Sequence, residues 1–330
     1  MPMSYRKTAF LSVCAAMGFA LVTAQQLPAQ TYPSRSVSFV VPYAPGGGTD
    51  VYSRLLADEL RDKLKQPFVI DNKAGAATQI AASAVVNAPA DGYTLMMGSS
   101  TTLAMNPALY NKLSYNADDF APIARVGSAY FLLVGSPSLP AKTLPELIAY
   151  IKSQPPGTLS YASSGAGTPH HLFMEMFLGM IGAKMIHVPY RGSVPALTDV
   201  LAGTIPMMMV DLTPAQQLID DGKIRAFGVT GPQRAKPAPN IPTIAEAGLP
   251  GYAGEGWFGV IAKKGTPAPI IETLNKVITS YIDRPEVQDK IYAVGIQPKT
   301  STSQEFIAFV ADEQKKWASV IAKAGIPKMN

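Results

Sequence analysis

Two glycine-bearing loops carry the residues whose types and spacing suggest a binding chemistry. The first reads Tyr43-Ala44-Pro45-Gly46-Gly47-Gly48-Thr49-Asp50, and the second reads Ser163-Ser164-Gly165-Ala166-Gly167-Thr168. Each loop lies between an apolar run and a helix-like segment, so backbone N–H groups are free where the helix dipole adds positive potential. Two such loops, far apart in the chain, predict two walls of one cleft that holds a small anion, and a carboxylate fits best.

The first loop matches neither of the common phosphate-binding motifs. No Gly-Lys-Ser/Thr follows its glycines, and their spacing differs from that of a dinucleotide-binding turn. An anion-binding nest and a tight turn that needs positive φ both remain open. We expect Thr49 and Asp50 to cap the following helix. Asp50 is not expected to contact the ligand, because its negative charge would repel an anion.

The second loop offers hydroxyl groups that could bind both oxygens of a carboxylate or act as nucleophiles. A nucleophilic serine needs a base and an orienting acid, and no Gly-x-Ser-x-Gly elbow is present. A secreted serine hydrolase using Ser163 or Ser164 with His171 stays open as the alternative function. Thr168 and Pro169 are expected as the cap and the first residue of the next helix.

Other polar residues have side chains that could serve metal or ligand binding. His171 and Glu175 are four residues apart, but no third ligand has metal-binding spacing, so we predict neither a metal nor a cofactor. Asp211 ends an apolar run and could contact a ligand or water in the crevice, or cap the next helix. The formal net charge is +5 without a run of basic and aromatic residues, so nucleic acid is not an expected partner.

The first 24 residues have the pattern of a secretory signal peptide. Arg6 and Lys7 precede an uncharged apolar stretch, and small residues allow cleavage after Ala24 or after Ala29. An uncleaved anchor helix is the alternative. Removing these 24 residues lowers the formal net charge from +5 to +3 and takes away Cys14, the single cysteine. We therefore expect a periplasmic protein whose mature form has no disulfide.

Strand-like and helix-like segments alternate along the mature chain, which predicts an α/β protein with mostly parallel sheets covered on both faces. Short apolar runs predict strands at 37–41, 68–70, 94–97, 131–134, 159–162, 185–188, 205–210, 224–229 and 257–262. The three strands at 185–188, 205–210 and 224–229 are predicted to be buried. Helices are predicted between them and at 270–281, 285–293 and 303–323. Crossovers near 125–130 and 252–257 would divide the chain into a first domain, 31–129 plus 253–330, and a second domain, 130–252.

Six motifs in order resemble the extracytoplasmic solute receptors of tripartite tricarboxylate transporters, the Bug-type receptors. They are Pro42-Tyr43-Ala44-Pro45-Gly46-Gly47-Gly48-Thr49-Asp50, Asp91-Gly92-Tyr93-Thr94-Leu95, Tyr161-Ala162-Ser163-Ser164-Gly165, Val188-Pro189-Tyr190-Arg191-Gly192-Ser193, Pro242-Thr243-Ile244-Ala245-Glu246-Ala247-Gly248-Leu249-Pro250 and Gly265-Thr266-Pro267. The resemblance covers nearly the full mature length. It implies a type II periplasmic binding protein fold, the Venus flytrap, with two doubly wound α/β domains joined by two crossover strands, and it implies no catalysis.

The resemblance also implies a function and a site. A receptor of this kind captures a small organic carboxylate, either a di- or tricarboxylate or an aromatic acid, and delivers it to the membrane subunits of its transporter; we expect a monomer. In the family, loops that match the two described above hold the ligand carboxylate largely through backbone groups and ordered waters. The positions carried over are Tyr43, Ala44, Gly47, Ser164, Gly165, Thr168 and Asp211, to which we add Ser99 and Ser100 at the end of a predicted strand.

Overall fold

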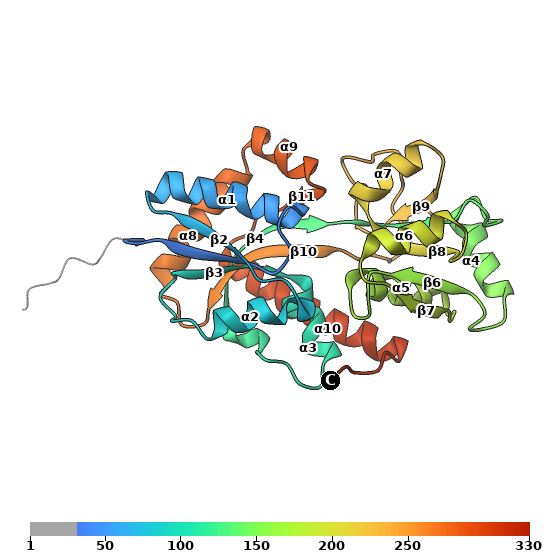
Figure 1. Ribbon diagram of the computed structural model, residues 1–330, viewed down its shortest axis with the longest axis horizontal. Helices are drawn as coiled ribbons and strands as arrows, with labels where there is room; N and C mark the ends of the chain where they lie inside the picture. The colour runs from blue at the N-terminus through green and yellow to red at the C-terminus, as the bar shows by residue number, and fades with distance from the viewer. Residues whose placement is uncertain (1–31) are drawn as a thin grey trace, which may run out of the picture.

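The computed structural model describes residues 32–330, which form two lobes, each built on one β-sheet (Figure 1). Strands β4 (Phe120–Ala129) and β10 (Gly256–Lys263) lead from one lobe to the other. The predicted signal peptide, residues 1–24, lies outside the described residues. The two-sheet α/β architecture predicted from the sequence is confirmed.

The first lobe, on the left in Figure 1, has a six-stranded sheet between two layers of helices. Its other elements are β1 (Val37–Val41), α1 (Gly48–Leu64), β2 (Phe68–Asn72), α2 (Gln79–Val86), β3 (Thr94–Ser99), the π-helical turn η2 (Thr101–Met105), α3 (Asn106–Leu109), α8 (Ala268–Ile282), α9 (Pro285–Ala293), β11 (Ile296–Pro298) and α10 (Ser303–Ala324). The strand order is β11-β4-β10-β3-β1-β2. Helices α1 and α8 bury their apolar stripes on one face, and α2, α3 and α10 cover the other.

The second lobe has a five-stranded sheet, also covered on both faces. Its elements are β5 (Phe131–Gly135), α4 (Leu144–Ser153), β6 (Ser160–Ser163), α5 (Pro169–Ile181), β7 (Ile186–Pro189), α6 (Ser193–Leu201), β8 (Met207–Asp211), α7 (Leu212–Asp220) and β9 (Arg225–Val229). The strand order is β7-β6-β8-β5-β9. Along β8, Met207 and Met209 point to the α4 and α5 side while Met208 points to the α6 and α7 side, as the period of a strand requires.

The prediction of mostly parallel sheets is wrong, because both sheets are mixed. Strands β1, β2 and β3 are mutually parallel, as are β6, β7 and β8, but β10 runs antiparallel to both β3 and β4. Strand β5 is likewise antiparallel to β8 and β9. The chain leaves the first lobe along β4 and returns along β10, and two neighbouring connections that run in opposite directions must pair antiparallel.

Two strands differ from their sequence patterns. β4 was missed because Pro122, Arg125 and Gly127 interrupt its apolar run, although eight of its ten residues pair with β10. β7 was predicted to be buried, yet it lies at the edge of its sheet, and Ile186 is 50% exposed. A short apolar run in the sequence therefore predicts a strand without showing whether it lies at the edge or in the centre of the sheet.

A polar group anchors the packing between the lobes. Helix α10 packs against α5, where the Trp317 ring lies 5.5 Å from the Phe173 ring. The buried Glu313 carboxylate accepts hydrogen bonds from the indole N–H groups of Trp257, at 3.0 Å, and Trp317, at 3.1 Å. The apolar core is thus continuous from one lobe to the other on this side. None of the helices within residues 32–330 has the length and apolar character needed to cross a bilayer.

Candidate ligand-binding site between the lobes

The first glycine loop connects β1 to α1 and is held in shape by Asp50. The helix begins at Gly48 with Gly47 as its cap, so the prediction that Thr49 and Asp50 are the capping residues is wrong. Asp50 lies inside the first turn and reaches back to accept the N–H of Gly46, which has φ +85°. Burial raises the pKa of Asp50, but the hydrogen bonds from Arg54, Gly46 and Asn72 outweigh it and leave the pKa below its ordinary value.

Ala44 and Gly47 are exposed on this loop, and Tyr43 beside them is partly buried. Burial raises the pKa of the Tyr43 phenol, whereas its hydrogen bonds with the Ser99 and Thr101 side chains partly offset the effect. Ser99 ends β3 and is buried, and Ser100 follows it, equally buried. The structure therefore brings Tyr43 and Ser99 together at the carboxyl ends of neighbouring parallel strands, where α/β proteins bind ligands.

The second glycine loop connects β6 to α5, as predicted. Thr168 is the helix cap and Pro169 the first helical residue, which confirms both assignments. The Thr168 hydroxyl donates to the carbonyl of Gly165 at 2.7 Å, so its hydrogen is used within the loop. Gly165 has φ +138° and Gly167 has φ +76°, which side chains rarely adopt, so both positions favour glycine.

A chain of three side chains links this loop to the end of β8. Ser164 Oγ lies 2.7 Å from His170 Nδ1, and His170 Nε2 lies 3.0 Å from Asp211 Oδ2. Burial alone would raise the pKa of Asp211, but the charge and hydrogen bond of His170 and a hydrogen bond from Ser193 lower it. The Asp211 side chain remains 45% exposed, so part of its carboxylate is accessible from outside the lobe. Asp211 is also the cap residue of α7, without a capping hydrogen bond from its side chain.

The other two histidines lie behind the loop and form a stacked pair. The rings of His171 and His187 are 3.9 Å apart and nearly parallel. His171 Nδ1 accepts the N–H of Gly167, and His187 Nε2 lies 2.6 Å from Ser163 Oγ. Burial lowers the pKa of His171 to about 3, with His187 contributing, and lowers that of His187 to about 4. The predicted pairing of Ser163 or Ser164 with His171 is therefore wrong, because each serine contacts a different histidine.

Two observations relate the residues of one lobe to those of the other. The charge of Asp211 in the second lobe contributes to raising the pKa of Tyr43 in the first, so the two side chains lie within electrostatic range of one another. Elsewhere along the same boundary, a Cβ on Gly295 of the first lobe would lie 2.6 Å from Thr213 Oγ1 of the second. The ends of the two lobes therefore carry hydroxyl groups that can donate hydrogen bonds to a small molecule with acceptor oxygens.

Sequence reasoning missed His170 and Thr101 as members of this group. His170 stands next to the proline that begins α5, and only the rotation of that helix places it toward Asp211 rather than toward the stacked pair. Thr101 belongs to the π-helical turn η2, a form that has no recognisable sequence pattern and that often occurs at functional sites. Within residues 32–330, no group of three or more acidic, histidine or cysteine side chains is placed to hold a metal ion.

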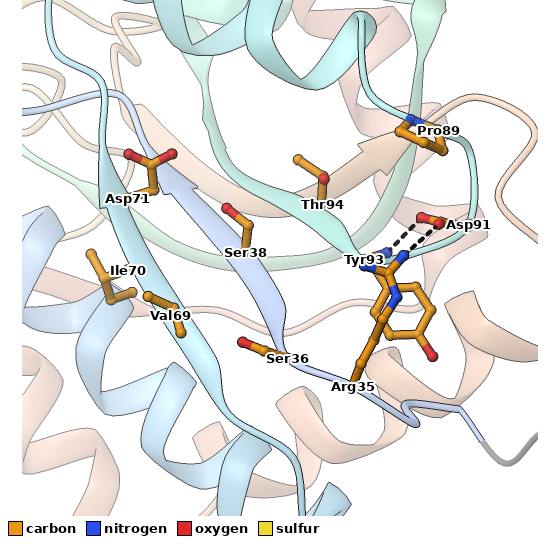
Figure 2. A pocket seen from close by; sticks show the side chains of 10 residues that line it. All are labelled: Arg35, Ser36, Ser38, Val69, Ile70, Asp71, Pro89, Asp91, Tyr93 and Thr94. Atoms are coloured by element: carbon orange, nitrogen blue, oxygen red, sulfur yellow. Dashed lines mark hydrogen bonds and ion pairs between the residues drawn. The ribbon is translucent and has the colours of Figure 1, made fainter.

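A hollow of about 640 Å³ on the first lobe is separate from this site (Figure 2). It lies over the first halves of β1 and β3 and over Val69, Ile70 and Asp71 of β2, and the Arg35–Asp91 ion pair, 3.0 Å long, forms one wall. The glycine loop after β1 lies at the other end of these strands. Because open parallel sheets bind ligands at the carboxyl ends of their strands, this hollow does not compete with the space between the lobes.

Comparisons with known proteins identify the family and the fold of this chain. The family model described as "Tripartite tricarboxylate transporter family receptor" matches residues 52–326. Protein BugT of Bordetella pertussis is 36% identical over 304 residues, which cover 92% of this chain and 93% of BugT. An R. palustris protein, Rpa4515, solved with adipate, is 36% identical with a TM-score of 0.79 and covers 90% of this chain and 100% of its own.

MatC from Rhodopseudomonas palustris, solved with bound malate, is 31% identical with a TM-score of 0.74 and covers 88% of this chain and 100% of its own. The periplasmic binding protein BugD is 31% identical with a TM-score of 0.75 and covers 90% of this chain and 100% of its own. These likenesses confirm the periplasmic binding protein fold with two α/β domains. The chain belongs to the receptor family of the tripartite tricarboxylate transporters, the Bug-type periplasmic solute-binding receptors.

Proposed function

We propose that this protein captures a small organic dicarboxylate between its lobes and delivers it to the membrane subunits of a tripartite tricarboxylate-type transporter. The observation that carries the proposal is that the Asp211 charge in the second lobe acts on Tyr43 in the first, with Ser99 beside Tyr43 and with Ser164 and His170 beside Asp211. The choice of a dicarboxylate follows from two family structures, one solved with adipate and one with malate. Delivery to membrane subunits, export by a cleaved signal peptide and a monomeric state are parts of the same proposal.

The site would act through the donors of both glycine loops. Tyr43, Ala44, Gly47, Ser99 and Ser100 would form the wall in the first domain, 31–129 plus 253–330. Ser164, Gly165, Thr168 and Asp211 would form the wall in the second domain, 130–252. A ligand that contacts both walls stabilises the closed arrangement relative to an open one, and β4 and β10 are the connections that would bend.

The experiment is a thermal-shift screen of carboxylic acids, followed by calorimetry. Adipate, malate, citrate and terephthalate would be compared with neutral sugars of similar size. A ligand at 100 times its dissociation constant stabilises the folded state by about 2.7 kcal/mol, which is easily measured as a rise in melting temperature. A rise with a neutral sugar but with none of the acids would refute the carboxylate assignment.

One observation favours a second function, a secreted serine hydrolase. Ser164, His170 and Asp211 contact each other in the order of a catalytic triad. The ring nitrogens are exchanged, however, because a triad histidine contacts serine through Nε2 and the acid through Nδ1. The variant Ser164→Ala separates the two functions: a receptor binds the acid more weakly and turns over no ester in either form, whereas a hydrolase loses turnover of an ester panel.

The transporter partner is tested separately. Co-purification of the exported protein with the membrane subunits of a tripartite transporter, in the presence of the acid that binds, would support delivery. Binding of the acid without any such association would leave a receptor that serves another purpose.

A further inference from the structure

We propose that a cavity behind the second glycine loop is a second binding site, which takes an uncharged, mostly apolar molecule that carries a hydrogen-bond acceptor. The cavity has a volume of about 600 Å³. Ala166 and Gly167 of the loop line it, whereas none of the residues assigned above to the carboxylate site does. The inference therefore does not rest on the proposed function.

Both lobes contribute walls to this cavity. The second lobe supplies residues of α5 and the chain that leads from α5 into β7, and the first lobe supplies the end of α10 and the tail that follows it. The backbone of Met329 in this tail donates to the carbonyl of Leu109 and accepts the N–H of Asn111, which holds the tail on the first lobe. Helices α5 and α10 pack together where the lobes meet (Figure 1). Cavities of this volume at the boundary between two domains are typical sites for small molecules.

His171 brings a buried hydrogen-bond donor to the cavity. Its side chain belongs to the lining, and the residue is only 7% exposed. Nδ1 accepts the backbone N–H of Gly167 at 3.0 Å, so this nitrogen carries no hydrogen, and the neutral ring carries its hydrogen on Nε2. Burial, with a contribution from His187, lowers the pKa of His171 to about 3, which agrees with a neutral ring. Within residues 32–330, Nε2 forms no hydrogen bond.

The neighbours of His171 do not supply the missing acceptor. The His187 ring is nearly parallel to that of His171, so an N–H in the plane of one ring cannot point at the other. His187 Nε2 also lies 2.6 Å from Ser163 Oγ. Glu175, one helical turn further along α5, accepts the hydroxyl hydrogen of Tyr161 at Oε1. Because a buried donor without an acceptor is costly, a molecule that enters the cavity gains affinity by accepting from Nε2.

The rest of the lining suits an apolar body. Leu178, Met185 and Ile326 contribute apolar side chains from both lobes. Gly179 and Gly182 leave room beside them, since a Cβ on either glycine would meet no atom within 4 Å. A ring system can therefore occupy the cavity while its polar group reaches His171.

Charged groups of both signs surround the cavity. Lys184 and Lys323 carry positive charge. The Glu175 carboxyl group opposes them, as do the ends of α5 and α10, where the last carbonyl groups carry the negative end of each helix dipole. Since neither sign predominates, the cavity favours a molecule without net charge, in contrast to the carboxylate expected between the glycine loops.

The experiment uses indole-3-carboxamide as the probe, because it joins an apolar ring system to an uncharged group with a carbonyl acceptor. Two matched compounds test each feature: 3-methylindole lacks the acceptor, and indole-3-carboxylate carries a negative charge. Each would be titrated into the exported protein, without any dicarboxylate, while NMR follows the ¹⁵N shift of His171 Nε2. We expect a saturable shift with the carboxamide, and binding about tenfold tighter than that of either matched compound.

Two variants on adjacent residues locate the binding. Gly179 lies inside α5, so Gly179→Phe fills the cavity with a ring without straining the helix, and it should abolish the shift. Met180→Phe is the control, because Met180 is 41% exposed and does not line the cavity, and it should bind the probe as the parent does. If Gly179→Phe does not fold, Ala324→Phe fills the cavity from the wall formed by α10.

The outcomes separate the parts of this inference from each other and from the proposed function. No saturable shift of His171 with the carboxamide, or equal binding in the parent and in the variant with the filled cavity, would overturn the site. Equal affinities for the three compounds would overturn the acceptor and the absence of charge as the features recognised. Since the titrations contain no dicarboxylate, this site can fail while the proposed function stands, and the reverse also holds.

Discussion

Asp50→Asn should destabilise the first lobe and weaken ligand binding, although the substitution keeps the size of the side chain. Asp50 is 2% exposed, and its carboxylate accepts four hydrogen bonds. Oδ2 accepts from the backbone of Gly46 and from Arg54 Nε, and Oδ1 accepts from Arg54 Nη2 and from Asn72. An asparagine has one acceptor oxygen, so its amide nitrogen must face two of these donors.

The magnitude follows from the two donors that lose their acceptor. Each unpaired buried donor costs about 1–3 kcal/mol. Arg54 is 51% exposed and can turn to water, so its share lies at the low end. We expect a loss of about 2–4 kcal/mol in the free energy of unfolding, or roughly 5–10 °C in melting temperature. Since the pKa of Asp50 is lowered by folding, its contribution is fully present at neutral pH and is lost as the pH falls below the ordinary carboxyl range.

The assay is urea unfolding without ligand, followed by the fluorescence of the buried Trp257 and Trp317. The matched control is Asp58→Asn, the same exchange on the same helix. Asp58 is 61% exposed and pairs with Arg61 at 2.6 Å, so its loss should cost less than about 0.5 kcal/mol. Equal stabilities for the two variants would refute the view that Asp50 fixes the loop. Ligand affinity, measured on the same samples, should fall in Asp50→Asn alone.

Three further predictions concern the second lobe and the boundary between the lobes. Folding lowers the pKa of His171 from 6.5 to about 3 and of His187 to about 4, so the unfolded chain binds more protons than the folded one. As the pH is lowered from about 6.5 to about 4, the free energy of unfolding should fall by up to about 2.7 kcal/mol per pH unit, and the urea midpoint should fall with it. A stability that does not change with pH would contradict the neutral stacked pair. Gly295→Ala places a Cβ 2.6 Å from Thr213 Oγ1 and should hinder closure of the two lobes. The decrease in radius of gyration on ligand binding, measured by small-angle X-ray scattering, should become smaller, and the dissociation constant should rise. The same decrease in the variant and the parent would contradict this prediction. Glu313→Leu leaves two indole N–H groups unpaired and should cost about 2–4 kcal/mol in urea unfolding, whereas Glu313→Gln keeps an acceptor and should cost much less; equal losses would show that the hydrogen bonds are not the cause.

Much of the fold could be predicted because the pattern of apolar runs is set locally. The strand Val37–Val41 was predicted with its observed bounds, and helix Pro285–Ala293 likewise. The direction of the strands could not be predicted in the same way. It depends on how β4 and β10 pass between the lobes, and residues such as Pro122 and Gly259 in these strands weaken their local patterns. Gly259 is required by packing, since a Cβ there would lie 2.2 Å from the Phe306 ring.

The two loops of the candidate site could be predicted from the sequence. The contacts that their side chains make could not. Ser163 and Ser164 are neighbours with the same chemistry, yet one is fully buried against His187 and the other contacts His170. The strand ends at Ser163 and the chain turns at Ser164, so only the structure shows which histidine each serine contacts. Asp50 was predicted as a cap because its sequence neighbours fit that role, and its backward bond to Gly46 depends on the positive φ of that glycine.

The adjacent histidines show the same limit and give it a physical cause. His170 and His171 are separated by about 100° around the axis of α5, so one can face the space between the lobes while the other faces the sheet interior. Their surroundings then set opposite electrostatics: His170 contacts the ionised Asp211, whereas burial and the ring of His187 lower the pKa of His171. The acidic side chain at the end of β8 is therefore paired with the histidine that points toward it, whereas the stacked pair behind the loop stays neutral.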